Sequence, residues 1–431
     1  MKLQIIFQNS FYKKGFLTAE IMLAFSLFIL FTISTFTLLA SMQRLKTLSL
    51  KELDKMKDFV YKMDNSIDLA IVQYGNDSQV LSNYLFTLSK SDYVESWGRN
   101  SCNSRINFDQ NKIKYFPNGI DMGISNASTD IEVRNGIVYL TADSATLSKP
   151  DFFIINAKNP ANPVIISSLN TGPGISAIEI AGPYAFMAQA STVNQIQIID
   201  IHNRNAPQLI SQIKLPTPTP TTTAPFATSI FYSKGYVYLG TVKWVGAEFS
   251  IIDISNIHSP VVVGQFETNT LINDIYVRGN KAYLASSDEK QIRILDVSNK
   301  SNPILIDYFS PTGWQTQEGK TLDFFEGHVG FGRTVGGFNV IANHEAFIFS
   351  TTTYISSDTA GGVYGMLLRP SFNFLLTHQG GKEFQVFDST LKNKLFDMPL
   401  GSQPVKMACD GDKIFFATGN GLGLSILELG E

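Results

Sequence analysis

The sequence predicts an all-β protein, a β-propeller of about seven blades, preceded by a long N-terminal α-helix. Three observations lead to this fold class. A motif of strand, polar turn and strand recurs about every 45 residues from residue 130 onward, a period typical of propellers. The composition is 44% apolar with 32 Phe, and only 16% of residues are charged. Residues 16–40 are apolar or small apart from Glu20, and this run is long enough to span a bilayer.

Each repeat contains an apolar strand that ends in Asp or Asn, followed seven positions later by Pro. An Asp or Asn at this place can accept backbone N–H groups of the following turn. Pro suits the start of an outer strand, because the N–H that it lacks is not needed there for a hydrogen bond to a neighbouring strand. We therefore interpret these residues as turn formers and not as catalytic or metal-binding groups. The clearest copies are Asn156 with Pro163, Asp200 with Pro207, Asp253 with Pro260, and Asp296 with Pro303.

Weaker copies end at Ala342, Asp388 and Glu428, which gives seven countable units. The last unit lacks a fourth strand, and residues 112–118 stand before the first unit in the place of an outer strand. We expect this segment to close the ring, which removes the free seam. A count of six blades is the alternative.

Closure of the ring would place both cysteines of the chain, Cys102 and Cys409, in one blade. Outside the cytoplasm they could form a disulfide that locks the ring. Two buried free thiols are the alternative.

The four clearest units resemble the LVIVD repeat, a propeller repeat of bacterial and archaeal surface proteins. In that repeat an LVIVD-like strand is followed by an Asn-Pro turn, as in Asn159-Pro160 and Asn302-Pro303 here. The resemblance is good over residues 131–302 and weak beyond them. It implies four-stranded blades on a protein of the cell surface.

The segment KKGFLTAE resembles the processing site of type IV prepilins and pseudopilins. The resemblance implies that prepilin peptidase cuts after Gly15, that Phe16 becomes the methylated N-terminus, and that Glu20 pairs with the terminal amine of a neighbouring pilin or pseudopilin subunit. Residues 17–19 depart from the commoner Thr-Leu-Ile of the family. An uncleaved membrane anchor is the alternative, but it does not explain a carboxylate in the apolar segment.

These features divide the chain into a leader (1–15), a hydrophobic then amphipathic pilin-like helix (16–70), an irregular neck (71–111) and the propeller (112–431). We expect residues 16–40 to lie in the inner or cytoplasmic membrane before assembly. The propeller is then extracytoplasmic, at the cell surface or on a pilus.

The sequence contains no signature of catalysis or of metal or cofactor binding. The five His show no metal-ligand spacing, and neither HExxH, CxxC nor GxSxG occurs. A net charge of −3 argues against direct nucleic-acid binding. Units five and six depart most from the repeat, and their loops hold the candidate ligand-binding residues Trp314, Glu318, Glu326, His328, Arg333 and Tyr364.

The sequence thus predicts a non-enzymatic, pilin-like surface protein. We expect a minor or tip subunit of a filament whose propeller mediates adhesion or binds an unknown extracellular ligand. The alternatives are a surface receptor on one uncleaved transmembrane helix and a membrane-tethered propeller enzyme.

Overall fold

In the computed structural model the chain divides into two units, Met1–Leu81 and Ser82–Glu431. In the first unit, β1 (Val72–Tyr74) and β2 (Asp77–Gln79) form an antiparallel pair. The predicted leader and helix, with Gly15, Phe16 and Glu20, lie outside the described residues. The described residues are 72–74, 77–79, 101–102, 108–117, 127–143, 149–220, 222–310, 318–325, 328–334, 338–341, 352–355, 362–369, 371–388, 393–419 and 423–430.

Within these ranges every regular element is a β-strand, and no helix is long and apolar enough to cross a membrane.

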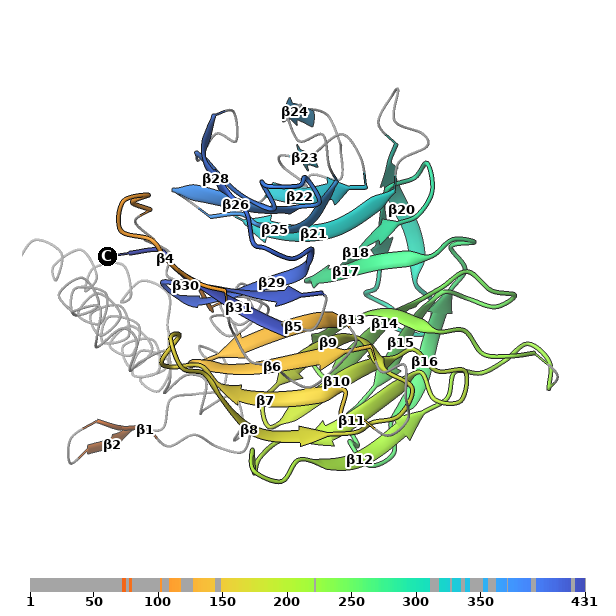
Figure 1. The fold of residues 1–431 in the computed structure, drawn as a ribbon. Coiled ribbons are helices and arrows are strands. Elements are labelled where there is room, and N and C mark those ends of the chain that lie inside the picture. Colours follow the sequence, from red (N-terminus) through yellow and green to blue (C-terminus); the bar gives the residue numbers. More distant parts are fainter. Residues whose placement is uncertain are drawn as a thin grey trace, which may run out of the picture. The chain divides into compact units, whose positions relative to one another are not determined.

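The second unit contains six four-stranded antiparallel blades, each made of four consecutive strands (Figure 1). Blade 1 is β5 (Ser128–Arg134), β6 (Ile137–Ala142), β7 (Phe152–Asn156) and β8 (Val164–Leu169). Blade 2 is β9 (Ile175–Ala181), β10 (Tyr184–Gln189), β11 (Ile196–Asp200) and β12 (Gln208–Ile213). Blade 3 is β13 (Ala227–Ser233), β14 (Tyr236–Thr241), β15 (Phe249–Asp253) and β16 (Val261–Phe266).

Blades 4 to 6 follow the same order of strands from the inside to the outside. Blade 4 is β17 (Ile272–Arg278), β18 (Lys281–Ser286), β19 (Ile292–Asp296) and β20 (Ile304–Phe309). Blade 5 is β21 (Gly319–Phe325), β22 (His328–Arg333), β23 (Phe338–Ile341) and β24 (Thr352–Ile355). Blade 6 is β25 (Val363–Leu367), β26 (Phe372–Thr377), β27 (Phe384–Asp388) and β28 (Lys394–Met398).

A five-stranded sheet, here called the closing sheet, completes the ring. It combines β29 (Pro404–Gly411), β30 (Lys413–Thr418) and β31 (Gly423–Glu428) with β4 (Lys114–Phe116) and β3 (Ser101–Cys102) from the N-terminal side. The predicted closing segment does supply the outer strand, because Phe116 pairs with Ile426 and Lys114 with Glu428. Figure 1 shows the orange β4 beside the blue β30 and β31.

The prediction of about seven blades is wrong, and the alternative count of six is confirmed. Six blades are complete units of consecutive strands, and the remaining repeat has only three strands of its own. Its sheet therefore recruits β4 and also β3, which pairs in parallel with β29 at one end. The expected neck was irregular throughout, yet its residues Ser101 and Cys102 are part of this sheet.

The core lies between the blades, which pack face to face around the ring. Each inner strand lies against the inner strand of the next sheet, and β29 lies against β5. The second and third strands are buried on both faces, which explains apolar runs such as FFII in β7. The outer strands are half-buried or exposed.

Aromatic rings join neighbouring blades in this core. Phe186 of blade 2 stacks on Tyr232 of blade 3 with ring centroids 5.5 Å apart. Phe231 of blade 3 contacts Tyr276 of blade 4 at 5.0 Å. Such aromatic pairs contribute to stability beyond the apolar area that they bury. Because they join neighbouring blades, each blade is stabilised by its neighbours.

Candidate functional site

The antiparallel order of each blade gives the propeller two different faces. One face, here called the turn face, carries the hairpins between first and second strands and the turns between third and outer strands. The other, the loop face, carries the loops between second and third strands and the connections from one blade to the next. Because β3 and the start of β4 pair with the turn-face ends of β29 and β31, the chain enters the closing sheet on the turn face.

The repeated Asp and Asn residues lie on the turn face and hold its turns. Asp200 Oδ1 accepts the N–H of His202 at 2.8 Å, and Asp253 Oδ1 accepts that of Ser255 at the same distance. Asn156 makes the equivalent bond at 3.2 Å. At Asp296 the backbone N–H of Ser298 lowers the pKa of the carboxyl.

The prolines of the motif stand directly before the outer strands: Pro163 before β8, Pro207 before β12, Pro260 before β16 and Pro303 before β20.

The inner strands carry a repeated bulge at their loop-face ends. In each of them the register shifts at the second residue. A bulge re-aims its side chain, and here it directs the side chain toward the next blade. Thr228 Oγ1 donates to Ile272 O at 2.6 Å, and Asn273 Nδ2 donates to Gly319 O at 2.8 Å. The bulged residues are Thr129, Ser176, Thr228, Asn273, Lys320, Tyr364 and Val405.

Two aspartates that follow the bulged residues, the buried Asp274 and the half-buried Asp130, add a second bond between blades. Asp274 Oδ2 accepts the N–H of Leu322 in blade 5 at 2.9 Å, and its Oδ1 accepts the N–H of Ile275 at 3.0 Å. Asp130 accepts the N–H of Ile178 in blade 2 in the same way, at 2.9 Å. These carboxylates act as fixed acceptors for backbone groups that water cannot reach.

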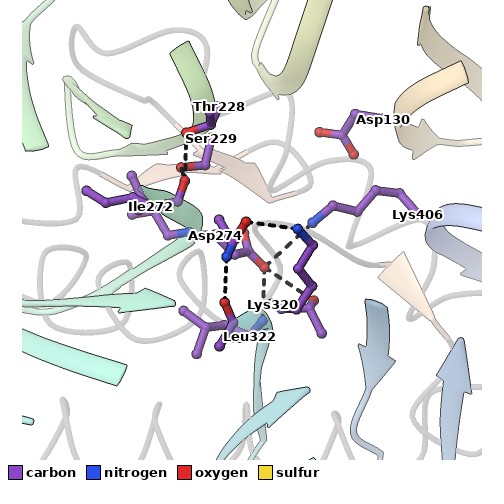
Figure 2. Close-up of polar contacts among 12 residues, drawn as sticks. Asp130, Thr228, Ser229, Ile272, Asp274, Lys320, Leu322 and Lys406 are labelled. Atoms are coloured by element: carbon purple, nitrogen blue, oxygen red, sulfur yellow. Dashed lines mark hydrogen bonds and ion pairs between the residues drawn. The ribbon is translucent and has the colours of Figure 1, made fainter. Parts of the chain in front are cut away.

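The central channel is too narrow to be a substrate pocket. Its free volume is about 60 Å³, and all of its lining belongs to the inner strands. A water molecule needs roughly 10–15 Å³ and ligand pockets have about 300 Å³ or more, so the channel has room for a few waters. Lys406 reaches into it and lies 3.7 Å from Asp274 Oδ2 (Figure 2).

A cluster of titratable groups lies on the loop face of blades 4, 5 and 6, next to the junction of blade 6 with the closing sheet. Lys320 Nζ donates to Asn273 Oδ1 at 3.0 Å and lies 5.6 Å from the ring centroid of Tyr364. The Tyr364 ring stacks on His378 with centroids 3.4 Å apart. Glu318 accepts a hydrogen bond from Ser287 Oγ at 3.0 Å. We call Glu318, Lys320, Tyr364 and His378 the loop-face cluster.

The ring of His378 bridges blade 6 and the closing sheet. Its Nε2 lies 3.1 Å from Pro404 O, and its Nδ1 lies 2.8 Å from Gln403 Nε2. Because a carbonyl accepts only and an amide nitrogen donates only, the neutral ring with its proton on Nε2 satisfies both contacts. An open hollow of about 330 Å³ adjoins His378 and is lined further by Gly380, Glu383, Pro399, Gly401, Ser402 and Gln403.

Burial and neighbouring charges shift the pKa values of the cluster. Burial lowers the pKa of Lys320, and the positive charge of Lys406 lowers it further, against the opposing effect of Glu318. Burial also lowers the pKa of His378 and raises that of Tyr364. Groups with several perturbed pKa values on one surface are typical of functional sites.

Exposed apolar side chains lie on the same face, over blades 2 and 3. Val245 is 72% exposed in the loop between β14 and β15, and Phe226 is 47% exposed just before β13. The two segments are joined by a bond from Val242 N to Phe226 O at 3.0 Å. The Pro- and Thr-rich insertion at residues 216–225 belongs to the same connection.

The candidate ligand residues named from sequence fall into three groups. Glu318 and Tyr364 belong to the loop-face cluster. Arg333 was expected in a loop, but it lies at the end of β22 and is fully buried, because blade 5 continues its strand to that residue. Trp314, Glu326 and the side chain of His328 lie outside the described residues.

Sequence reasoning missed Lys320 and gave no role to His378. The signal that marks Lys320 is its position as the second residue of an inner strand, where blades 1 to 4 have Thr, Ser or Asn. Within the described ranges no group of His, Cys, Asp and Glu could hold a metal ion.

The cysteines belong to the closing sheet. Cys409 is buried in β29 and is disulfide-bonded. Cys102, the only other cysteine in the sequence, is in β3, where its backbone pairs with Gly411. The strand pairing therefore brings both cysteines to one end of one sheet.

Comparison with known families and structures agrees with this geometry. The LVIVD repeat family matches residues 175–214, 226–268 and 272–310, which are blades 2, 3 and 4 from inner to outer strand. The chain contains LVIVD repeats. Blade 1, which the sequence placed among the clearest copies, lies outside these matched segments. No curated protein matches the chain.

Solved structures similar to this chain are propellers of very different sequence. The WD40 β-propeller domain of Doa1 is 13% identical with a TM-score of 0.53, over 73% of this chain and 96% of that domain. The computationally designed Ika8 protein is 11% identical with a TM-score of 0.51, over 70% of this chain and 96% of its own. At such identity the likeness concerns the fold alone.

Proposed function

We propose that this protein is a non-enzymatic surface protein whose propeller binds a protein partner or ligand through its loop face. A β-propeller with LVIVD repeats is consistent with a protein-interaction domain. The observation that carries the proposal is the asymmetry of the two faces. The turn face is built from repeated turns and receives the incoming chain, whereas the loop face holds the insertion with the exposed Phe226 and Val245, and the loop-face cluster.

The proposal is tested by photo-crosslinking from each face in the native host. A photoreactive amino acid replaces Val245 on the loop face, or Val164, which is 55% exposed at the turn-face end of β8, as the matched control. We expect a specific crosslinked partner from position 245 and none from position 164. The purified partner should then bind more weakly to Val245→Asp and Phe226→Asp, but equally well to Val164→Asp. Crosslinking that is equal at both positions, or confined to 164, would contradict the proposal.

We further propose that the chain is a pilin-like minor or tip subunit of a type IV pilus-like filament. The support is the sequence around Gly15, Phe16 and Glu20, which resembles a prepilin processing site. In this proposal prepilin peptidase removes the leader and residues 16–40 hold the protein in the membrane. Glu20 then pairs with a neighbouring subunit during assembly, where the ion pair offsets the cost of a carboxylate in an apolar helix.

The N-terminal sequence and intact mass of the protein from native membranes test this role. We expect a chain that begins at methylated Phe16, and a Gly15→Ala variant that keeps its leader. Gly98→Ala, which changes a glycine far from Gly15 along the chain, is the control and should be processed like the wild type. A wild-type chain that keeps residues 1–15 would contradict the pilin role and favour a receptor on an uncleaved anchor.

A further inference from the structure

The hollow between blade 6 and the closing sheet has one carboxylate in its wall. Its volume is about 330 Å³, and among its lining residues Glu383 is the only acidic one. His378 also lines it, but the two ring nitrogens of His378 already contact Pro404 O and Gln403 Nε2. The charge that this hollow offers to a ligand is therefore the negative charge of Glu383.

Glu383 occupies a position of the repeat that is buried in other blades. It stands directly before the third strand, as Asp151 and Glu248 do in blades 1 and 3, and each accepts an N–H from the connection after the outer strand. Asp151 and Glu248 are 0% exposed, whereas Glu383 is partly exposed. Blade 6 therefore keeps the structural bond from Leu400 N to Glu383 Oε2, at 3.2 Å, while the carboxylate also lines the open hollow.

Two glycines keep this carboxylate uncovered. Gly380 precedes Glu383 in the loop between β26 and β27, and Gly401 lies in the connection from β28 to β29. Both line the hollow, and a Cβ at either position would have no atom within 4 Å. Gly401 also has a φ of +74°, a conformation that favours glycine. The hollow exists because no side chain fills it.

Other polar side chains of the hollow are available as acceptors. Ser402 Oγ is buried and has no hydrogen-bond partner among the described residues. Gln403 donates its amide nitrogen to His378 Nδ1, so its amide oxygen is left to accept. A cationic group with several N–H donors suits these oxygens and Glu383, because charge-assisted hydrogen bonds are roughly twice as strong as neutral ones.

The neighbouring lysines do not occupy this place. Lys382 Nζ lies 4.0 Å from Asp397 Oδ2, and Lys320 contacts the Tyr364 ring and is not among the lining residues. In the part of the chain that the structure describes, no ion pair joins Glu383 to a cation. A cation from another molecule would therefore meet a carboxylate whose charge is not yet paired.

We propose that this hollow binds an arginine or lysine side chain from a basic segment of a protein partner, which docks on the loop face at blade 6. The cationic group pairs with Glu383 and donates further to Ser402 Oγ and the amide oxygen of Gln403. The volume of the hollow is in the range of small ligand pockets, so it accepts a whole side chain. This inference rests on the proposed function of the loop face and names the chemistry of the partner.

Binding of an acetylated hexa-arginine amide to the full-length protein in detergent tests the proposal. The salt concentration is about 0.15 M, which screens long-range attraction between charges. Hexacitrulline, which has nearly the same shape without the charge, is the control peptide, and calorimetry measures the dissociation constants. We expect hexa-arginine to bind the wild type and hexacitrulline not to bind.

Three variants locate the binding. Glu383→Gln removes the charge and should bind hexa-arginine at least tenfold more weakly. Gly380→Leu keeps the charge but fills part of the hollow, and it should weaken binding to a similar extent. Glu289→Gln, which removes an exposed carboxylate from the loop face of blade 4, is the matched control and should bind like the wild type.

Thermal unfolding separates binding from a structural role. Blade 2 has Gln195 at the position of Glu383, and its Oε1 accepts Leu215 N at 2.8 Å. Glu383→Gln can therefore keep the bond to Leu400 N, and we expect its unfolding temperature without peptide to match that of the wild type. Hexa-arginine should raise the unfolding temperature of the wild type and not that of Glu383→Gln, because a ligand stabilises only the state that binds it. If Glu383→Gln does not fold, the binding by Gly380→Leu decides.

Three results would overturn the proposal. Hexa-arginine does not bind the wild type; or it binds Glu383→Gln or Gly380→Leu as tightly as the wild type; or methylguanidinium binds as tightly as hexa-arginine, which means a small-cation site. The first result leaves the proposed function to be decided separately, because the crosslinking from Val245 does not depend on hexa-arginine.

Discussion

Asp274 offers a direct test of how the blades are joined. The side chain is 2% exposed and accepts three hydrogen bonds, from Ile275 N at 3.0 Å, Leu322 N at 2.9 Å and Thr321 Oγ1 at 3.3 Å. Asp274→Ala leaves two buried N–H groups without this acceptor, and each such group costs about 1–3 kcal/mol. We expect the free energy of unfolding to fall by about 3–4 kcal/mol, since removal of the buried charge offsets part of the loss.

The measurement is guanidinium chloride unfolding of the full chain in detergent, followed by tryptophan fluorescence. Asp274→Asn keeps one acceptor oxygen and should lose less, about 1–2 kcal/mol. Asp307→Ala is the matched control, because Asp307 Oδ1 also accepts the next N–H, that of Tyr308 at 2.8 Å, but on the exposed outer strand β20. This control should change stability by no more than about 0.5 kcal/mol. Equal losses in Asp274→Ala and Asp307→Ala would refute the argument.

Two further predictions concern the loop face and the closing sheet. Burial, aided by Lys320, lowers the pKa of His378 below the value of about 6.5 for an unfolded chain. The folded state therefore binds fewer protons here, and stability should fall as the pH drops from about 6.5 through the folded pKa. His378→Gln should lose less stability than wild type between pH 7.5 and 5 in thermal unfolding, and an equal pH dependence would contradict this assignment. For the cysteines, peptide mapping without reductant should recover Cys102 and Cys409 in one linked fragment, and Cys409→Ala should lower stability by about 2–5 kcal/mol. Two free thiols in the wild type would exclude the bridge.

The fold could be predicted from the repeat because the interactions that define each unit lie within that unit. The strand, the Asp or Asn, and the Pro before an outer strand each act within one unit, so their spacing indicates a blade without knowledge of its neighbours. The same reasoning led to the closing segment, since a unit with three strands has an unpaired edge. Blade 5 was harder to predict, because its repeat motif has diverged. Arg333 was therefore assigned to a loop, although it is the last residue of β22 and is buried in the core.

The candidate site was less accessible to sequence reasoning. Glu318 and Tyr364 were noticed because they lie in divergent units, but Lys320 looked like an ordinary surface lysine. Its special position depends on Asn273, Tyr364 and Lys406, which come from three different sheets. The repeat places Asn273, Lys320 and Tyr364 at equivalent positions of successive inner strands, but their contacts could not be predicted, because the bulge that turns Lys320 toward its neighbours appears only when the strands pair.

The sequence by itself determined the β-propeller with its LVIVD repeats, the turn residues and the origin of the closing strand, because these depend on interactions within one unit or on one missing strand. It also contains the segment around Gly15 on which the pilin proposal rests. The tertiary structure decided that six blades are complete, that β3 joins the closing sheet, and that the loop-face cluster exists. The physical reason is that these features depend on contacts between blades, where residues far apart in the chain meet.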